Sequence, residues 1–414
     1  MHILLIHQSF TALDEPGGTR HHEMARHLAA KGHRITVIAS QVSYLTGSTK
    51  PENIGALQRN SIVERNHLGQ IDIHRVYTYP ALHRSFAHRL FAFFSFMIMS
   101  FWAGLKVNNV DVVWGTSPPI FQGITAWALG KLKRAAFLFE VRDLWPSFAV
   151  GIGVLKQPSL IYASEWLERF LYRRANLVIV NSPGFIEHVR LKGARQVELV
   201  PNGSDISMFD PQDDGSLFRK KFDLEDKFVV LYAGAHGISN DLEVVLEAAH
   251  LLQSCPEVVI VFLGDGKEKS SLMSKATKMG LENVKFLPPI PKNEMPGALA
   301  AADTCLAILK PIPQYTTVYP NKVFDYMAAG RPVILAIAGV ICQVVEGAEA
   351  GITIPPGNAK ALAESINTLA NNRELGYEMG KRGRAAVKAH FDRPLLARKL
   401  EKILLDYFEP NHQT

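Results

Sequence analysis

Short apolar runs alternate with longer amphipathic segments along the whole chain. The first series of apolar runs comprises residues 2–8, 34–39, 110–114, 137–141 and 177–180. Apolar runs of this length, separated by segments of helical length, are typical of a parallel β-sheet buried on both faces. A second series follows at residues 228–232, 258–263, 284–287, 304–308 and 333–336. Two such series predict an α/β protein made of two Rossmann-like domains.

Residues 201–227 separate the two series. This stretch is polar, rich in turn-forming residues and without a sustained apolar period, so we expect a linker followed by a short helix that opens the second domain. The last amphipathic segment, residues 393–408, comes after the second series. Its pattern is compatible with packing on either domain. A length of 414 residues agrees with two or three domains.

Residues 90–105 form the most apolar stretch of the chain and carry no charge. As a helix at about 1.5 Å per residue this stretch would span about 24 Å, less than the ~30 Å hydrocarbon core of a bilayer. Basic residues flank it, namely Arg84, His88, Arg89 and Lys106. An aromatic-rich segment with basic ends is typical of a helix that inserts into one leaflet. We therefore predict membrane contact through residues 84–106; a core helix of a large α/β domain is the alternative.

Charge and cysteine content narrow the choice of partner and compartment. Residues 1–200 contain 22 Lys and Arg against 13 Asp and Glu, whereas the rest of the chain contains 23 against 26. A basic domain favours an anionic partner such as a lipid headgroup or a phosphate. Nucleic acid is disfavoured because the excess is small and no recognition motif accompanies it.

Three cysteines without a CxxC pair predict a reducing compartment and no structural zinc site. The short apolar start predicts no secretory signal.

A glycine-rich turn follows the first predicted strand. Gly17 and Gly18 stand before the first predicted helix, and Arg20 follows them. Glycines allow a close backbone approach to a ligand, and a helix N-terminus offers free N–H groups to an anion. The turn lacks the full GxGxxG pattern, which disfavours a nicotinamide dehydrogenase. A plain turn is the alternative.

The second series repeats this design twice along one edge of its sheet. One turn spans residues 232–237 and ends at Gly237, and the next contains Gly264 and Asp265. A single turn of this kind is not specific, but two at one edge of one domain predict a nucleotide site.

Three charged residues follow the apolar run at 137–141. Glu140, Arg142 and Asp143 stand at the carboxyl end of this predicted strand, the edge where open α/β sheets bind ligands. They are suited to an acid–base or phosphate-binding set. A network of ion pairs that fixes the loop is the alternative.

The segment 319–334 gives the most specific signal. After Tyr319, Asn321 is a favourable N-cap, and a glycine and a proline further on predict the end of a short helix. Lys322 would lie in the first helical turn, where the helix terminus already favours an anion, and it suits a diphosphate. Asp325, one turn later, is placed to accept hydrogen bonds from ribose hydroxyls. A capped surface helix with an exposed Lys and Asp is the alternative.

Several segments together resemble the retaining glycosyltransferases of family 4 over nearly the whole chain. They are GGTRHHEMARHLAAKGHRITVIAS, VELVPNGSDISMF, FLGDGKEKSSL, NVKFLPPIPKNEM and PNKVFDYMAAGRPVILAI. EVRDLWP and PNKVFDYMAAGRP look most like a bacterial branch that builds O-antigen and capsule repeats and includes N-acetyl-L-fucosamine transferases. The resemblance implies the GT-B fold, with two Rossmann-like domains facing across a cleft and a C-terminal helix crossing back. Residues 1–200 and about 390–414 would form the acceptor and membrane-side domain, and residues 201–389 the donor domain.

The resemblance also implies an activity. A sugar would move from a UDP-sugar to a polyprenyl-diphosphate-linked acceptor, without a metal or other cofactor, on the inner face of the cytoplasmic membrane. Gly17, Gly18, Gly237 and the segment with Tyr319 would take part in donor binding. A non-hydrolysing UDP-sugar 2-epimerase, which shares the architecture, and a non-catalytic membrane-associated scaffold are the alternatives.

This sequence departs from the family pattern at its charged positions. The family's Glu-x7-Glu motif falls on Thr317 and Asp325, so only the second carboxylate persists. The usual Arg and Lys after the glycine loop are missing, and the usual His falls on Arg142. Lys322 is therefore expected to neutralise the diphosphate, with help from Arg20. Either of the neighbouring carboxylates, Asp143 or Glu140, is expected to orient the acceptor hydroxyl.

Overall fold

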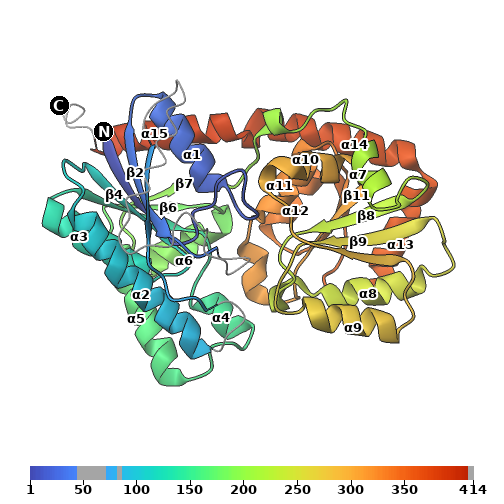
Figure 1. Ribbon diagram of the computed structural model, residues 1–414, viewed down its shortest axis with the longest axis horizontal. Helices are drawn as coiled ribbons and strands as arrows, with labels where there is room; N and C mark the ends of the chain where they lie inside the picture. Colours follow the sequence, from blue (N-terminus) through green and yellow to red (C-terminus); the bar gives the residue numbers. More distant parts are fainter. Residues whose placement is uncertain (44–70, 82–85, 409–414) are drawn as a thin grey trace. The chain divides into compact units, whose positions relative to one another are not determined.

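The computed structural model describes residues 1–43, 71–81 and 86–408, and the chain divides into two units (Figure 1). Unit 1 comprises Met1–Ala12, Gly18–Pro201 and Pro394–Thr414, and unit 2 comprises Leu13–Gly17 and Asn202–Arg393. Each unit contains one parallel sheet between two layers of helices. This is the α/β architecture that the two series of apolar runs predicted.

The sheet of unit 1 has seven parallel strands in the order β3-β2-β1-β4-β5-β6-β7. They are β1 (His2–Ile6), β2 (Arg34–Ser40), β3 (Ile71–Val76), β4 (Val112–Ser117), β5 (Ala136–Val141), β6 (Leu177–Val180) and β7 (Val197–Leu199). The predicted bounds of the strand at 110–114 are wrong. The chain turns at Asn109 with φ +55°, and the carboxylate of Asp111 accepts a hydrogen bond from the backbone N–H of His2, so β4 begins only after these residues.

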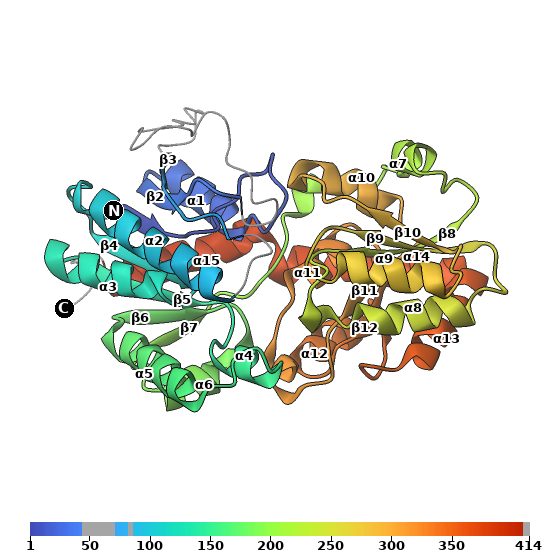
Figure 2. The ribbon, with the colours of Figure 1, turned by 60° about the horizontal axis from the view of Figure 1, so that its bottom comes forward.

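Two layers of helices cover this sheet. The inward sides of α1 (Arg20–Ala30) and α15 (Arg393–Phe408) share a core with alternate residues of the strands, such as Ile3 and Leu5. The opposite face is covered by α2 (Phe86–Leu105), α3 (Gln122–Lys133) and α5 (Pro158–Arg174), which neighbour one another in that order (Figures 1 and 2). The short helices α4 (Ser147–Gly151) and α6 (Ile186–Leu191) complete the unit.

Helix α15 settles the question that its sequence pattern left open. Leu396, Leu400 and Leu404 are buried in the same core as β1 and α1, so the end of the chain completes unit 1 although unit 2 precedes it in sequence. The C-terminal helix that crosses back is therefore confirmed.

The sheet of unit 2 has six parallel strands in the order β10-β9-β8-β11-β12-β13. They are β8 (Phe228–Ala233), β9 (Val258–Leu263), β10 (Val284–Leu287), β11 (Thr304–Ile308), β12 (Val333–Ala336) and β13 (Gly351–Thr353). One face packs against α10 (Met295–Ala300), α11 (Asn321–Ala328) and α12 (Val340–Gly347). The other face packs against α8 (Leu242–Leu251), α9 (Lys269–Lys278) and α13 (Ala359–Asn371). Helices α7 (Ser216–Lys221) and α14 (Arg373–Ala386) flank these layers.

The apolar segment predicted to meet a membrane forms α2, which begins four residues before the uncharged run. Within the described ranges, His88–Leu105 is the one helical window long and apolar enough to cross a membrane, and 22% of it is buried. Its exposed apolar side chains, Phe91, Phe94, Ile98 and Trp102, recur at the spacing of one helix face. Arg84 lies outside the described residues.

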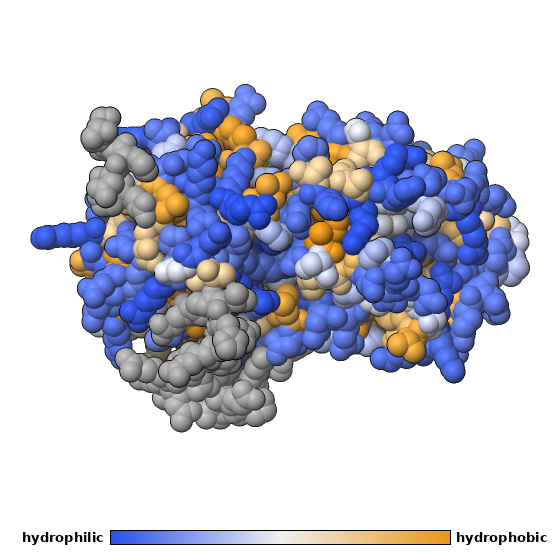
Figure 3. Space-filling view, turned by 90° about the horizontal axis from the view of Figure 1, so that it is seen from above, coloured by the Kyte–Doolittle hydropathy of each residue, from blue (hydrophilic) through white to orange (hydrophobic). Residues whose placement is uncertain are grey.

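The face of the molecule seen from above carries both hydrophilic and apolar side chains (Figure 3). Seen from above, it is mostly hydrophilic, and apolar side chains gather only in small patches (Figure 3). Isolated apolar side chains are ordinary on a folded protein, whereas several on one helix face point to a contact surface.

Candidate functional site

Two glycine turns pack against each other at the carboxyl edge of the unit 2 sheet. Gly234 follows β8 with φ +143°, and Gly264 follows β9 with φ +146°. A Cβ atom added to Gly264 would lie 2.0 Å from the carbonyl oxygen of Gly234, so a larger residue cannot occupy this position. The backbone N–H of His236 donates to the carbonyl of Asp265 at 2.8 Å. The two predicted turns therefore pack into one loop structure. A ligand beside it can contact the protein backbone.

The ammonium group of Lys322 lies against this loop structure. Lys322 is in the first turn of α11, as predicted, and its Nζ is 3.9 Å from the centre of the Tyr232 ring. A Cβ atom on Gly234 would lie 2.9 Å from Nζ. This nitrogen is buried and has no hydrogen-bond partner among the residues that the structure describes. Burial lowers the pKa of Lys322 to about 7, because no anion among the described residues stabilises its charged form.

His236 lies beside the same loops and was not among the predicted site residues. Its side chain is fully buried, and neither ring nitrogen has a hydrogen-bond partner within the described part of the chain. Burial, and then the charge of Lys269, lowers the pKa of His236 to about 4, so the ring is neutral at pH 7. In the sequence this position is only one member of the turn at residues 232–237. An unpaired buried imidazole beside Lys322 adds a second polar group that a ligand can satisfy.

Asp325 is surrounded by donors from three parts of unit 2. Its carboxylate accepts hydrogen bonds from Lys292 Nζ at 2.7 Å, Ser204 Oγ at 2.6 Å and Asn321 Nδ2 at 3.3 Å. A carboxylate has about four acceptor positions, so these three contacts leave about one position, enough for a single ribose hydroxyl. Lys292 and Ser204 were not predicted, since they are 33 and 121 positions away in sequence. Only the fold brings them to α11.

The predicted N-cap role of Asn321 is wrong. Pro320, with an extended backbone, occupies the N-cap position, and Asn321 is the first residue of α11. The side chain of Asn321 instead connects Asp325 to Arg393, whose Nη2 donates to Asn321 Oδ1 at 3.3 Å. It organises the start of the helix through side chains rather than through a cap.

The other predicted residues of this segment lie at its border. The carbonyl of Tyr319 accepts a hydrogen bond from Asn202 Nδ2 at 2.7 Å, and its ring packs against Phe324. The hydroxyl of Thr317 donates to the carbonyl of Gln314 at 2.7 Å and belongs to a short 3-10 turn. Gly237 is open, because an added Cβ would approach only Asn240 Nδ2, at 3.6 Å.

In unit 1, Glu140 and Arg20 form a buried ion pair at the carboxyl half of β5. Arg20 Nε donates to Glu140 Oε1 at 3.0 Å, and the two terminal nitrogens of Arg20 donate to the carbonyls of Pro201 and Val200 at 2.7 Å each. Burial opposes ionisation of Glu140, but the adjacent His21 and Arg20 outweigh it and hold its pKa well below the usual range. The geometry thus gives Arg20 partners inside unit 1. Its predicted contact with a donor stays a prediction.

His21 and His7 extend this buried cluster and were not predicted. His21 Nε2 lies 2.6 Å from Glu140 Oε2, and burial lowers the pKa of His21 to about 4, so the neutral ring donates this hydrogen bond. The His7 ring, just beyond β1, lies 4.3 Å from the His21 ring. Burial and the neighbouring His21 lower the pKa of His7 well below its usual value. Arg20 is therefore the cation that balances Glu140.

Asp143 and Arg142 follow the same strand, and the charge of Arg142 contributes to the lowered pKa values of His7, His21 and Glu140. Arg142 Nε donates to the carbonyl of Ser117 at 2.9 Å. Asp143 Oδ1 is buried and has no hydrogen-bond partner among the described residues. Burial raises the pKa of Asp143 to about 6. A half-neutral, unpaired carboxyl at a sheet edge is suited to exchange a proton near pH 6.

The first glycine turn is divided between the units. Gly17 has φ +143° and belongs with residues 13–17 to unit 2, whereas Gly18 opens the next segment of unit 1. A Cβ atom on Gly18 would meet no atom within 4 Å, so packing does not require glycine there.

Two family models match the chain, one on each half. The model described as Glycosyl transferase 4-like domain matches residues 17–203, and the model described as Glycosyl transferases group 1 matches residues 214–386. Over 359 residues the chain is 27% identical to WcaI of Escherichia coli (strain K12), whose name describes a colanic acid biosynthesis glycosyl transferase. This match covers 83% of the chain and 86% of WcaI. Several other curated relatives are matched over roughly half of their own length.

Solved structures of similar fold cover nearly the whole chain. Sucrose-phosphate synthase from Thermosynechococcus elongatus has a TM-score of 0.78 at 20% identity, with 98% of this chain and 99% of that chain covered. Anabaena Alr3699/HepE in complex with UDP-glucose has a TM-score of 0.71 at 20% identity, with the same coverage. Likeness at this identity concerns the fold, and it confirms the GT-B fold class predicted from the sequence.

Proposed function

We propose, from the match of its two halves to the group 1 and 4-like glycosyltransferase families, that the chain is a GT-B glycosyltransferase that transfers a sugar from a UDP-sugar to a lipid-linked acceptor. Unit 2 binds the donor in this proposal and unit 1 meets the acceptor. The observation that carries the donor site is the buried, unpaired ammonium of Lys322 against the Gly234 turn. Such a cation is suited to a diphosphate.

The choice of uridine rests on the resemblance and on a structural neighbour. HepE is described in complex with UDP-glucose, and the same class of donor is proposed for this chain. Asp325 faces the ribose in this proposal, and Lys292 holds its carboxylate in place. The transferred sugar is N-acetyl-L-fucosamine or another N-acetylated sugar, as the resembled bacterial branch implies.

The proposed chemistry is a transfer with retention of configuration. The bond between the anomeric carbon and the diphosphate oxygen breaks, and its electron pair stays on the diphosphate. The acceptor hydroxyl oxygen forms a new bond to the same face of the anomeric carbon, and its proton passes to the leaving diphosphate. Lys322 and the backbone N–H groups of the glycine turns stabilise the charge that grows on the leaving oxygen. These groups supply the positive charge, so the proposed step uses no metal ion or other cofactor.

Asp143 is the carboxylate proposed to orient the acceptor hydroxyl. Both oxygens of Glu140 already contact Arg20 and His21, so Glu140 is left with a supporting role. Asp143 Oδ1 is unpaired within the described ranges, and Arg142 beside it keeps a positive charge near the acceptor.

The acceptor is proposed to be a polyprenyl-diphosphate-linked saccharide of bacterial surface polysaccharide synthesis. The name of the relative WcaI refers to such a polysaccharide. Helix α2 with its exposed aromatic face places the enzyme on the inner face of the cytoplasmic membrane in this proposal. The epimerase alternative gains no support from the two matched families, and the scaffold alternative is separated by the experiment below.

The first experiment is calorimetric binding of UDP, GDP and ADP to the wild type. We expect UDP to bind in preference to the others and Asp325→Ala and Lys322→Ala each to weaken UDP at least about tenfold, since loss of a buried charge partner costs about 2–5 kcal/mol. Lys278→Ala, an exposed lysine of α9, is the matched control and should bind UDP like the wild type. Transfer is then measured with a UDP-sugar panel and a polyprenyl-diphosphate acceptor. Absence of nucleotide binding would favour the scaffold alternative.

A further inference from the structure

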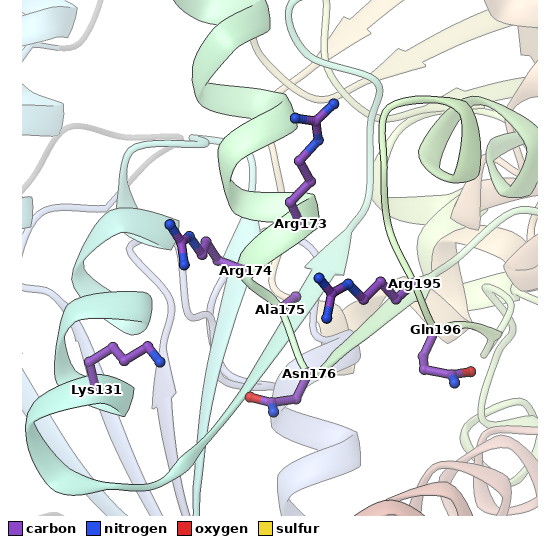
Figure 4. A pocket seen from close by; sticks show the side chains of 7 residues that line it. All are labelled: Lys131, Arg173, Arg174, Ala175, Asn176, Arg195 and Gln196. Carbon is purple, nitrogen blue, oxygen red and sulfur yellow. The ribbon is translucent and has the colours of Figure 1, made fainter.

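A second cationic site lies in unit 1 at the edge of the sheet where β5, β6 and β7 begin, opposite the carboxyl edge that carries Glu140 and Asp143. It is a hollow of about 350 Å³. Four cationic side chains line it, namely Lys131, Arg173, Arg174 and Arg195 (Figure 4). Lys131 comes from the last turns of α3, the two neighbouring arginines from the last turn of α5, and Arg195 from the loop before β7. No carboxylate lines the hollow.

None of these four cations has a hydrogen bond or an ion pair with another residue in the described part of the chain; Arg174 only lies over the Phe170 ring, 5.7 Å from its centre. Basic residues at helix C-termini complement the helix dipole, which accounts for one cation at the end of α3 and one at the end of α5. It does not account for the second arginine of α5 or for Arg195, which follows no helix end directly. Four exposed cations around one hollow without a carboxylate create a local positive potential that attracts an anion.

The hollow continues toward an aromatic surface. An adjoining hollow of about 400 Å³ shares Lys131 and Arg174 and adds Arg134 and Trp127. The Trp127 ring contacts the Phe170 ring at 4.8 Å between centres, and Phe170 stacks on Trp166 at 5.4 Å. Trp166 is 57% exposed. This row of three rings therefore leads from the cationic hollow to the outer face of α5, where Tyr162 is also exposed.

We propose that this hollow binds a phosphate group, and that the adjacent aromatic row selects the phosphate of an anionic phospholipid headgroup. Arginine side chains suit phosphate because their planar N–H groups donate two parallel hydrogen bonds to it. A free inorganic phosphate offers the same charge but nothing to the aromatic row. The site extends the membrane contact under the proposed function to α3 and α5, and it uses no residue of the donor site.

The test is sedimentation of the full chain with vesicles. The wild type should bind phosphatidylglycerol vesicles and not phosphatidylcholine vesicles, and binding should weaken with salt. Arg173→Glu with Arg174→Glu should weaken binding at least about tenfold, because each basic residue near an anionic surface contributes about fivefold. Lys220→Glu with Lys278→Glu, on exposed positions of α7 and α9, changes the net charge equally. This control should retain wild-type binding.

A second pair separates the inference from simple misfolding. Lys131→Glu with Arg195→Glu removes exposed cations that have no side-chain hydrogen bond or ion pair in the described ranges, so its circular dichroism and unfolding temperature should match the wild type while vesicle binding falls. Unchanged vesicle binding in both pairs would overturn the site. Calorimetry with inorganic phosphate is the other arm: binding as tight as to the vesicles would overturn the lipid assignment. UDP binding should be unchanged in both pairs. If the wild type does not bind UDP, the donor site is wrong, and this result is independent of the vesicle experiment.

Discussion

At the scale of single residues, Lys322 is held where it destabilises the protein that lacks a ligand. A buried ammonium without a hydrogen-bond acceptor has lost its water and gained only the face of the Tyr232 ring. Proteins keep such a group where another molecule supplies the missing partner. Two predictions follow from this single nitrogen, one on stability and one on pH.

Lys322→Met should stabilise the empty protein and abolish its nucleotide site. Methionine fills similar space without a charge, so we expect the free energy of unfolding to rise by about 1–3 kcal/mol, the cost of an unsatisfied buried polar group. Differential scanning calorimetry without nucleotide measures this change, and UDP should no longer raise the unfolding temperature of the variant. Equal or lower stability of the variant would mean that the ammonium has a partner in the folded protein.

UDP affinity should fall as the pH rises from 6 to 8.5. Burial depresses the pKa of Lys322 to about 7, so the free protein carries the ammonium below this pH and loses it above. The diphosphate binds the charged form, and binding above pH 7 must therefore also take up a proton. Calorimetry in buffers of different ionisation enthalpy measures this proton uptake, which should be absent in Lys322→Met. A flat affinity across this range would contradict the assignment.

The residue scale also shows what sequence reasoning reached and what it missed. Lys322 and Asp325 were predictable because helix geometry fixes the first turn of a segment that begins after a proline. The contact between Asp325 and Lys292, and the pairing of Glu140 with Arg20 and His21, depend on strands and loops that meet only after folding. The sequence contains residue types that can pair at these sites, but it does not give the distances between them in the folded protein.

At the scale of elements, the apolar pattern found most of the strands and missed three. β6, β9, β10, β11 and β12 lie where their apolar runs are. β3 alternates buried and half-buried residues, and β7 and β13 have three residues each that are only half-buried. All three are edge strands, where a strand has fewer apolar neighbours and its sequence pattern is weak. The fourth edge strand, β10, was predicted from its apolar run.

Helix α2 shows how an element's orientation revises a prediction from composition. Its phenylalanines are equivalent in composition, but Phe96 is fully buried and Phe93 is half-buried. Only one face, with Phe91, Phe94 and Trp102, is available to a membrane. Composition alone could not separate these two groups, because the side that faces the sheet is set by the position of β2 and β3.

Replacing Phe91, Phe94 and Trp102 by Ser should release the protein from anionic vesicles without unfolding it. These side chains are 64%, 42% and 60% exposed, so the loss of apolar area affects the lipid contact and not the core. Sedimentation with vesicles measures the effect. Three exposed apolar residues elsewhere, Leu217, Leu251 and Tyr377, changed to Ser provide the control. Wild-type sedimentation of the α2 variant would refute the membrane contact of this face.

At the scale of the whole molecule, the two units differ in how their cores are assembled. Unit 2 is built mainly from one continuous stretch, Asn202–Arg393, whereas unit 1 needs Pro394–Thr414 after it. Leu400 and Leu404 are almost fully buried with Ile3 and Leu5 of β1. The amphipathic pattern of residues 393–408 predicted the helix and left its partner open, whereas the family resemblance assigned it to the first domain, where the fold has it.

Leu400→Ala and Leu404→Ala should each destabilise unit 1 by about 2–5 kcal/mol, the usual cost of truncating a buried leucine. In differential scanning calorimetry we expect the unfolding transition of unit 1 to move to lower temperature. The transition of unit 2, which UDP should stabilise, should keep its temperature. Lys399→Ala and Lys402→Ala on the exposed side of α15 should change neither. Equal shifts of both transitions would indicate that the units unfold together.

The late position of α15 has a consequence for biosynthesis. The ribosome delivers β1 first and α15 almost four hundred residues later, so one face of the first sheet stays without its covering helix during most of translation. Domains usually fold in the order of their synthesis. Here the main stretch of unit 2, which comes second, is complete before the last helix of unit 1 emerges. The nascent protein should therefore expose one apolar face of its first sheet to chaperones until α15 has emerged and packed against it.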